Sequence, residues 1–225
     1  MKRSIIITAG GIGKRMESEL PKQFLRLGNK PVLLHTLERF FAFDPTAQLL
    51  LTLPKDWLSY WQTILAEYNI QIPHELVDGG LERFHSIQNA LEKCTGDQIA
   101  IHDGVRPLVS LATIERCFAG LNKAPAVVPV LGLKDSLRKG VFEKSESVDR
   151  SQYFLVHTPQ CFDAKTIKKA YLQGFNPRFT DDASVVEAIG VCPLLVLSND
   201  ENIKITTPED LLFANMLLEK YRDWG

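Results

Sequence analysis

Apolar and polar residues follow two patterns that alternate along the chain. Short runs rich in Ile, Val and Leu are followed by longer stretches in which apolar residues return every three or four positions. The first pattern is typical of strands buried on both faces, and the second of amphipathic helices. Their alternation indicates βα units around a mostly parallel sheet, so the chain is predicted to have an α/β fold.

The patterns place the elements as follows. The expected strands are Ser4–Ala9, Gln48–Leu53, Ile72–Val77, Gln98–His102, Ala126–Val130, Tyr153–His157 and Pro193–Leu197. The expected helices are Val32–Phe41, Trp57–Tyr68, Glu82–Lys93, Ala112–Leu121, Ala164–Leu172, Asp182–Ile189 and Pro208–Tyr221. The last helix has the clearest start, because Thr207 is a suitable N-cap and Pro208 suits the first helical position. The acids Glu209 and Asp210 follow there, close to the positive end of the helix dipole.

One segment interrupts the alternation. Between Leu131 and Arg150 the chain becomes polar, with Gly140 near the middle. Such a segment favours a hairpin that projects from the sheet, and an ordinary excursion loop is the alternative. The chain contains no internal repeat, low-complexity tract or linker, so we expect a single domain over residues 1–225 with a β-arm insertion at about 131–152.

The composition limits the classes of function. The chain has 225 residues, of which 45% are hydrophobic, and this supports a sizeable core. Its 26 Lys and Arg residues against 27 Asp and Glu residues give a net charge of -1. That balance excludes a histone-like or polybasic protein, and we expect no nucleic-acid partner. No apolar run approaches the roughly 20 residues of a transmembrane helix, so we expect no membrane partner either.

The cysteines indicate a reducing compartment. Cys94, Cys117, Cys161 and Cys192 include no CxxC pair, and each has apolar or helical neighbours. A disulfide framework would instead be dense in cysteine and loops. We therefore expect four reduced core thiols in a cytoplasmic protein.

A glycine-rich turn follows the first expected strand. Gly10, Gly11 and Gly13 would let backbone N–H groups approach an anion, and Lys14 and Arg15 would neutralise it. The Walker pattern fails for lack of a suitably placed Gly-Lys-Ser/Thr, and the dinucleotide GxGxxG pattern fails because its third glycine is replaced by Met. The turn therefore favours a different phosphate-binding loop, although a tight βα turn with no ligand is the alternative.

Other basic and glycine-rich positions extend this candidate site. Lys22 follows Arg15 by seven residues, so both can converge on one polyphosphate unless Lys22 is a solvated surface residue. Gly79-Gly80 forms a second turn between an expected strand and helix, which suggests a ligand that spans two loops or, alternatively, a simple left-handed turn. Ligands of open α/β sheets bind beyond the carboxyl ends of the strands, so both turns are expected at one edge.

Asp103 is the candidate metal ligand. It directly follows a buried strand, and Mg²⁺ needs few protein oxygens when phosphates supply others. Arg106 is placed to bind a phosphate, with a structural Asp–Arg pair as the alternative. We expect His102 to be packed and hydrogen-bonded rather than a ligand.

The C-terminal half adds further polar groups. Lys204 falls in what we interpret as a short apolar strand, so its side chain is expected to point into a polar site. Asp181 and Asp182 fit equally well as helix N-cap residues or as site residues.

Taken in order, these motifs resemble one known family. The segments are AGGIGKRM, PKQF, DGGLERFHSI, HDGVRP, DR, HTPQ, TDDAS and NIKITTPEDL, and they extend from Ile5 to Leu211. They resemble the 2-C-methyl-D-erythritol 4-phosphate cytidylyltransferases, the CTP-using enzymes of the non-mevalonate isoprenoid pathway. The glycine turn and HDGVRP are shared with other nucleotidyltransferases, whereas the later series is more particular to this family and its ribitol-5-phosphate relatives.

The resemblance implies a role for each matching residue. The nucleotide-binding residues would be Ala9, Gly10, Gly11, Gly13, Gly80, Arg83, Ser86 and Gly104, of which Gly80 and Ser86 would recognise cytosine. The catalytic residues would be Arg15, Lys22 and Lys204, the metal ligand Asp103, and the substrate-binding residues Arg106, Ser136, Arg150, Thr158 and Thr180. The chain departs from the family pattern at Gly10, Leu81, Gly104-Val105 and Ser136, and Leu81 occupies a position that is often polar in the family.

The same resemblance implies the reaction and the assembly. CTP and a polyol phosphate would be the substrates, with a divalent cation such as Mg²⁺ as cofactor. The fold would be a Rossmann-like nucleotide-binding domain, with the projecting β-arm used in a homodimer. Ribitol-5-phosphate cytidylyltransferase and a non-catalytic nucleotide-binding module are the alternative functions.

Overall fold

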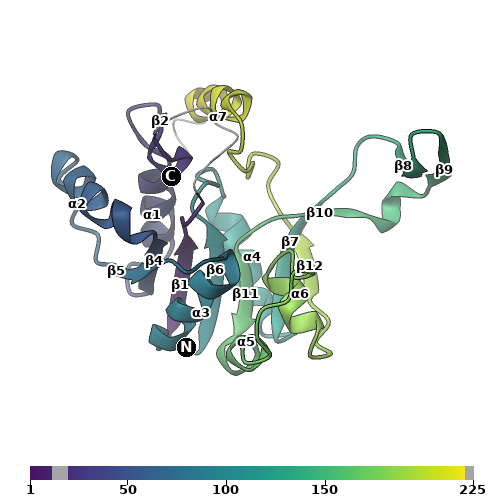
Figure 1. Cartoon of the computed structure of the whole chain (residues 1–225), viewed down its shortest axis with the longest axis horizontal. Helices are drawn as coiled ribbons and strands as arrows, with labels where there is room; N and C mark the ends of the chain where they lie inside the picture. The colour runs from purple at the N-terminus through teal and green to yellow at the C-terminus, as the bar shows by residue number, and fades with distance from the viewer. Residues whose placement is uncertain (12–19, 221–225) are drawn as a thin grey trace.

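The computed structural model describes residues 1–11 and 20–220, and its centre is a sheet covered by helices on both faces (Figure 1). The helices are α1 (Val32–Phe43), α2 (Leu58–Glu67), α3 (Arg83–Lys93), α4 (Leu111–Gly120), α5 (Ala164–Tyr171), α6 (Asp182–Glu187) and α7 (Pro208–Lys220). The strands are β1 (Arg3–Thr8), β2 (Arg26–Leu27), β3 (Lys30–Pro31), β4 (Gln48–Leu53), β5 (Glu75–Asp78), β6 (Gln98–Asp103), β7 (Ala126–Gly132), β8 (Leu137–Val141), β9 (Lys144–Val148), β10 (Phe154–Val156), β11 (Gln160–Asp163) and β12 (Leu194–Leu197).

The main sheet has the order β10-β7-β11-β6-β1-β4-β5, and β12 also pairs with β7. The pairs among β6, β1, β4 and β5 are all parallel, with Ile5 opposite both Leu49 and Ala100. β10 and β11 are antiparallel to their neighbours. The carboxyl ends of the parallel strands therefore meet at one edge of the sheet.

Successive residues of β1 divide the core into two layers. Ile5 and Ile7 pack in a cluster with Leu33 and Leu37 of α1 and with residues of α2 and α4. Ile6 faces the other way, into a cluster built from α3, α5 and α6. Because alternate side chains of a strand point to opposite faces, a strand covered on both sides must be apolar at every position. This explains the continuous Ile5–Ile7 run.

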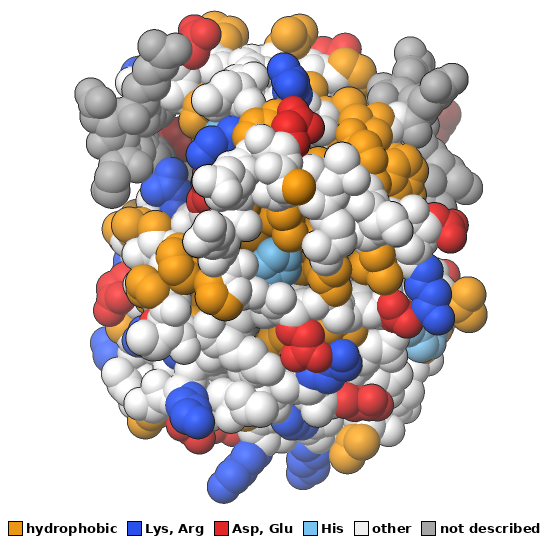
Figure 2. All heavy atoms as spheres, turned by 90° about the vertical axis from the view of Figure 1, so that its left-hand side faces the viewer, with side chains coloured by type: hydrophobic (Ala, Val, Ile, Leu, Met, Phe, Trp, Pro, Cys, Tyr) orange, Lys and Arg blue, Asp and Glu red, His pale blue; other side chains and the backbone are white. Residues whose placement is uncertain are grey.

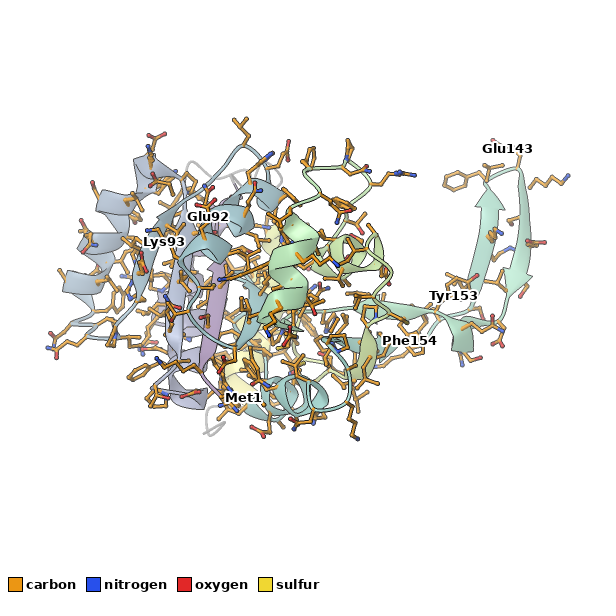
Figure 3. The ribbon with its side chains drawn as sticks, turned by 90° about the horizontal axis from the view of Figure 1, so that it is seen from below. Met1, Glu92, Lys93, Glu143, Tyr153 and Phe154 are labelled. Carbon is orange, nitrogen blue, oxygen red and sulfur yellow. The ribbon has the colours of Figure 1, made fainter. Side chains whose placement is uncertain are left out.

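A separate hairpin leaves the sheet between β7 and β10. Its strands β8 and β9 pair only with each other in the described structure, with Leu137 opposite Val148. Figure 3 shows Glu143 at the far end of the hairpin, and Tyr153 and Phe154 where the chain returns to the sheet. The structure thus contains the projecting hairpin that the polar segment predicts.

The expected elements agree with the structure to within a few residues, with four corrections. The expected strand at Ile72–Val77 begins only at Glu75. The sequence prediction missed β11, because Pro159 and Gln160 break the apolar pattern. Lys204 lies outside the described helices and strands. All four cysteines are free, but Cys192 is exposed, whereas the other three are buried. The expected cap of α7 is present: the Thr207 hydroxyl accepts from the Asp210 N–H at 3.4 Å, and Asp210 Oδ2 accepts from the Thr207 N–H at 2.9 Å.

On the face shown in Figure 2, described side chains of both signs are interspersed with scattered apolar ones, as expected for a chain of net charge -1. Within the described residues, no helix combines the length and apolar character needed to span a membrane.

Candidate functional site

The ends of three parallel strands form one cleft of about 330 Å³. Ala9 follows β1, Gly80 follows β5, and Asp103 ends β6. The lining residues are Thr8, Ala9, Gly10, Gly11, Lys22, Gln23, Gly80, Leu81, Glu82, Arg83, Ser86, Asp103, Val105 and Lys204. We call this the first cleft. It brings together most of the residues that the resemblance assigns to the nucleotide.

A second cleft of about 270 Å³ adjoins the first. Its lining residues are Arg83, Asp103, Arg106, Val156, His157, Thr158, Gln160, Thr180, Asp181 and Lys204. The residues common to both clefts are Arg83, Asp103 and Lys204. Ligands in the two clefts would therefore meet at these three charged side chains.

Asp103 lies among three cations. Its Oδ2 is 3.1 Å from Lys204 Nζ and 3.2 Å from Arg106 Nε, and its Oδ1 is 3.6 Å from Arg83 Nε. Burial by itself would raise the pKa of Asp103, but the charges of Arg83, Lys204 and Arg106 outweigh it and hold the pKa below the usual range. The carboxylate is thus ionised at neutral pH.

Arg83, the first residue of α3, connects Asp103 to a second carboxylate. Its two terminal nitrogens donate to Asp182, at 2.9 Å to Oδ1 and 2.7 Å to Oδ2. Burial would lower the pKa of Arg83, but Asp182 and Asp103 raise it above its usual value. Asp181, by contrast, is the N-cap of α6 and forms a capping box with Ser184. The two neighbouring acids therefore have different partners: Asp181 caps α6 at the edge of the second cleft, and Asp182 pairs with Arg83 in the interior.

A chain of hydrogen bonds beneath Asp103 fixes the state of His102. The Arg106 carbonyl lies 3.1 Å from His102 Nε2, so Nε2 must carry the proton. Burial lowers the pKa of His102 to about 3, so the ring is neutral and Nδ1 accepts the Thr158 hydroxyl at 3.0 Å. The Thr158 oxygen in turn accepts from the Asp103 N–H at 3.1 Å. In this arrangement the hydroxyl proton of Thr158 is committed to His102 rather than available to a phosphate.

The turn before α3 needs glycine at one position. A Cβ on Gly80 would lie 2.3 Å from His85 Cβ, which is too close for any other residue. The Gly80 N–H donates to the Ser86 hydroxyl at 2.9 Å, and that hydroxyl donates to the Glu82 carbonyl at 3.2 Å. These bonds fold the turn back over the start of α3, at the wall of the first cleft.

The remaining predicted residues are placed as follows. Lys22 lines the first cleft, Gly104 is buried directly after β6, and Thr180 lines the second cleft at the start of the segment leading into α6. Gly13 and Arg15 lie outside the described residues. Ser136 and Arg150 are exposed residues of the hairpin segment and are not among the lining residues of either cleft.

A divalent cation fits Asp103 only together with phosphates. Among the described residues, no group of three or more His, Cys, Asp and Glu side chains is close enough to hold a metal ion. Mg²⁺ commonly takes one or two carboxylates, with phosphate and water oxygens completing its shell. One buried carboxylate surrounded by cations therefore suits a Mg²⁺ that arrives with a polyphosphate, and does not suit a cage built from protein alone.

Sequence reasoning missed three polar residues that support the site. Gln23 is buried and donates to the Ala9 carbonyl at 2.8 Å, which holds the segment of Lys22 against the end of β1. Gln160 donates to Asp181 and accepts from the Ala183 N–H, both at 2.8 Å. Asn202 donates to the Thr158 carbonyl at 2.8 Å. All three lie within the motifs PKQF, HTPQ and NIKITTPEDL, but the sequence does not show which distant groups they bind.

Comparisons with known proteins point to one family over nearly the whole chain. The family profile described as 2-C-methyl-D-erythritol 4-phosphate cytidylyltransferase matches residues 4–220. A curated protein of the same name from Bacteroides fragilis is 51% identical over 219 residues, covering 97% of this chain and 100% of that protein.

Solved structures are similar over the same length. The crystal structure of 2-C-methyl-D-erythritol 4-phosphate cytidylyltransferase from Thermus thermophilus has a TM-score of 0.80 and 30% identity, and covers 97% of this chain and 100% of that one. The crystal structure of 4-diphosphocytidyl-2C-methyl-D-erythritolsynthase from Anaerococcus prevotii has a TM-score of 0.84 and 28% identity, covering 97% and 96%. The predicted α/β fold with a mostly parallel sheet is confirmed.

Proposed function

The chain belongs to the 2-C-methyl-D-erythritol 4-phosphate cytidylyltransferase family, and we propose that it transfers CMP from CTP to 2-C-methyl-D-erythritol 4-phosphate, releasing pyrophosphate. This is a nucleotidyltransferase reaction of non-mevalonate isoprenoid biosynthesis. The observation that carries the proposal is the pair of adjoining clefts with Arg83, Asp103 and Lys204 in common. A reaction between two phosphate-bearing substrates needs such a junction of charges.

We assign CTP to the first cleft. Its backbone-rich wall is formed by Ala9, Gly10 and Gly11 on one side and the Gly80–Ser86 turn on the other. Glycine backbone after a strand allows a phosphate to approach closely, and the turn suits the cytosine. We also assign Gly13, Arg83 and Gly104 to nucleotide binding. Lys22 and Arg15 are assigned to the triphosphate.

We assign the polyol phosphate to the second cleft. Arg106 lines it and is oriented by bonds to Asp103 and to the Asn202 carbonyl, the latter at 2.7 Å. Thr180 lines the same cleft beside Asp181. Thr158 lines this cleft as well. Its hydroxyl accepts from the Asp103 N–H and donates to His102, so its role is to position the backbone of Asp103.

In this mechanism a phosphate oxygen of the polyol attacks the α-phosphorus of CTP, and pyrophosphate leaves. The nucleophile is already ionised at neutral pH, so it needs no general base. The main obstacle is repulsion between two anions, which is roughly 1 kcal/mol at 4 Å in water and several times more in a drier site. Lys204, Lys22 and Arg15 reduce this repulsion and stabilise the charge that builds on the phosphates.

Asp103 would hold the divalent cation together with the triphosphate. Bound there, Mg²⁺ would offset phosphate charge and polarise the phosphoryl group. The residues of the chain bind and align the substrates around it.

We further propose a homodimer formed through the β-arm. Figure 1 shows the hairpin standing away from the main sheet. Ser136 and Arg150 line neither cleft of their own chain, which supports a role for them at a cleft of a second copy. At the base of the arm Phe154, Leu155 and Val156 are between 44% and 50% exposed. Contiguous exposed apolar side chains favour burial against a partner. Val156 also lines the second cleft, which links that surface to the site.

We also propose that the chain folds as one domain over residues 1–225 with the arm as an insertion. Cys94, Cys117 and Cys161 are buried free thiols, which supports a reducing, cytoplasmic setting.

The test is pyrophosphate release with CTP, UTP, ATP and GTP, each paired with 2-C-methyl-D-erythritol 4-phosphate, ribitol 5-phosphate or no acceptor. We expect rapid release only with CTP and the methylerythritol phosphate. Preference for ribitol 5-phosphate would establish the alternative polyol, and CTP binding without release in any mixture would establish a non-catalytic module.

A further inference from the structure

Asp182 is a fully buried carboxylate that the proposed reaction leaves without a role. It accepts three hydrogen bonds, two from Arg83 and one from the Tyr171 hydroxyl, the last at 2.6 Å to Oδ1. A buried charge is costly unless it is paired, so the pairing with Arg83 is a strong constraint on both residues.

The position of Asp182 is fixed from several sides. The Tyr171 ring stacks on Phe84 with centroids 4.4 Å apart. On either side of Asp182 in sequence, Asp181 and Ala183 are both bound to Gln160. Asp182 is therefore a rigid anchor, and Arg83 is the partner whose orientation follows from it.

Arg83 is shared unequally between two carboxylates. Both terminal nitrogens donate to Asp182 within 2.9 Å, whereas only Nε approaches Asp103, at 3.6 Å. A two-point guanidinium–carboxylate pair is stronger than a single contact, so Arg83 is held mainly by Asp182. Without the charge of Asp182, the nearby acceptor for the same guanidinium is Asp103.

We propose that Asp182 is a positioning residue that holds Arg83 away from Asp103 and so keeps the Asp103 carboxylate accessible to a divalent cation. The inference rests on the proposed function, in which Asp103 binds that cation.

Charge balance leads to the same result. The cluster of Asp103, Asp182, Arg83, Arg106 and Lys204 has three positive and two negative side chains. Asp182→Asn leaves three positive charges against one carboxylate, and that carboxylate is Asp103. Both the freed guanidinium and the added positive charge then oppose cation binding.

The experiment measures Mn²⁺ binding by water proton relaxation in the presence of CTP and without acceptor, so that no turnover is needed. We expect Asp182→Asn to weaken Mn²⁺ binding about tenfold or more. Tyr171→Phe is the matched control, because it removes one bond to Asp182 but keeps the pair with Arg83, and it should stay within about twofold of wild type. Thermal unfolding of each variant verifies that it is folded.

A double variant distinguishes a positioning role of Asp182, which acts through Arg83, from a general disruption of the site. Arg83→Gln combined with Asp182→Asn removes both charges of the pair and leaves two neutral amides that can hydrogen-bond. With the Arg83 guanidinium removed as a competitor for Asp103, the double variant should bind Mn²⁺ more tightly than Asp182→Asn alone. If Asp182→Asn does not fold, the double variant is compared with Arg83→Gln alone, because both lack that guanidinium. Mn²⁺ binding that agrees within about threefold supports the inference, and a larger loss in the double variant overturns it.

The outcomes separate a failure of this inference from a failure of the proposed function. Asp103→Asn must abolish most Mn²⁺ binding, and unchanged binding in that variant would overturn both the metal assignment and the role of Asp182. Loss in Asp103→Asn with unchanged binding in Asp182→Asn would overturn the role of Asp182 alone. A folded double variant that binds as poorly as Asp103→Asn would also overturn it.

Discussion

Lys204 Nζ lies 3.1 Å from Asp103 Oδ2, at the point where the two clefts meet. The pair joins the last residue of β6 to the segment that precedes α7. It places a cation on a long side chain beside the carboxylate proposed to hold the metal, with 44% of the lysine side chain exposed. Lys204 can therefore exchange Asp103 for a phosphate when substrates bind.

Lys204→Met should lower kcat/KM by roughly 10² or more, because it keeps the length of the side chain and removes the charge aimed at the reacting phosphates. Lys93→Met is the control, since Lys93 pairs with Glu75 at 2.7 Å and lines neither cleft. Steady-state kinetics with pyrophosphate detection provides the measurement. Equal activity of the two variants would remove Lys204 from the catalytic set.

Thr158→Val should destabilise the fold by about 1–3 kcal/mol, because it leaves His102 Nδ1 and the Asp103 N–H without their hydrogen-bond partner. Thr158→Ser keeps the hydroxyl and should therefore lose less stability than Thr158→Val. Urea unfolding of the three proteins compares their free energies of unfolding. If the valine variant is as stable as wild type, the hydrogen-bond chain through Thr158 does not stabilise the site.

His102 should make the protein sensitive to acid. Its pKa falls from 6.5 to about 3 on burial, so its contribution to stability is complete above pH 6.5 and is lost as the pH falls toward 3. Between pH 7 and pH 5 this loss is about 2 kcal/mol for the one residue. The free energy of unfolding of His102→Asn should therefore change about 2 kcal/mol less than that of wild type over this range. An identical pH dependence would show that His102 does not titrate on unfolding.

Arg150→Ala and Lys22→Ala should complement each other if the β-arm completes a site in its partner. Each variant alone should be impaired by roughly 10². After subunit exchange, a mixed dimer then contains one site with both lesions and one with neither, so it should have about half of wild-type activity. Because about half of the dimers in an equal mixture are mixed, the mixture should recover toward about a quarter of wild type. Verified exchange without recovery would mean that each site is confined to one chain.

The central strands and most helices could be predicted because the pattern of apolar and polar side chains in each shows which of its faces are buried. Gln48–Leu53 is apolar enough to indicate a strand covered on both faces, and its bounds agree with β4. β11 could not be predicted this way, because it is short and begins directly after Pro159. Its place between β6 and β7 depends on pairings distant in sequence.

The candidate site was predictable at its strand ends and not in its supporting contacts. Asp103 and the Gly80 turn follow apolar runs, so the rule for parallel sheets places them at one edge. Whether Asp182 was a cap or a site residue could not be decided, because its partner Arg83 is 99 positions away and only the folded chain brings them together. Lys204 points into the site as expected, although no strand holds it.

The central claim is that the acceptor phosphate attacks the α-phosphorus of CTP, and an isotope label in that acceptor phosphate tests it most directly. The protein is incubated with CTP and with methylerythritol phosphate carrying ¹⁸O in its phosphate group, and the products are analysed by mass spectrometry. We expect a cytidine diphosphate ester of methylerythritol that retains all of the label, together with an equal amount of unlabelled pyrophosphate. Absence of that ester, or ¹⁸O in the released pyrophosphate, would contradict attack by the acceptor phosphate on the α-phosphorus of CTP.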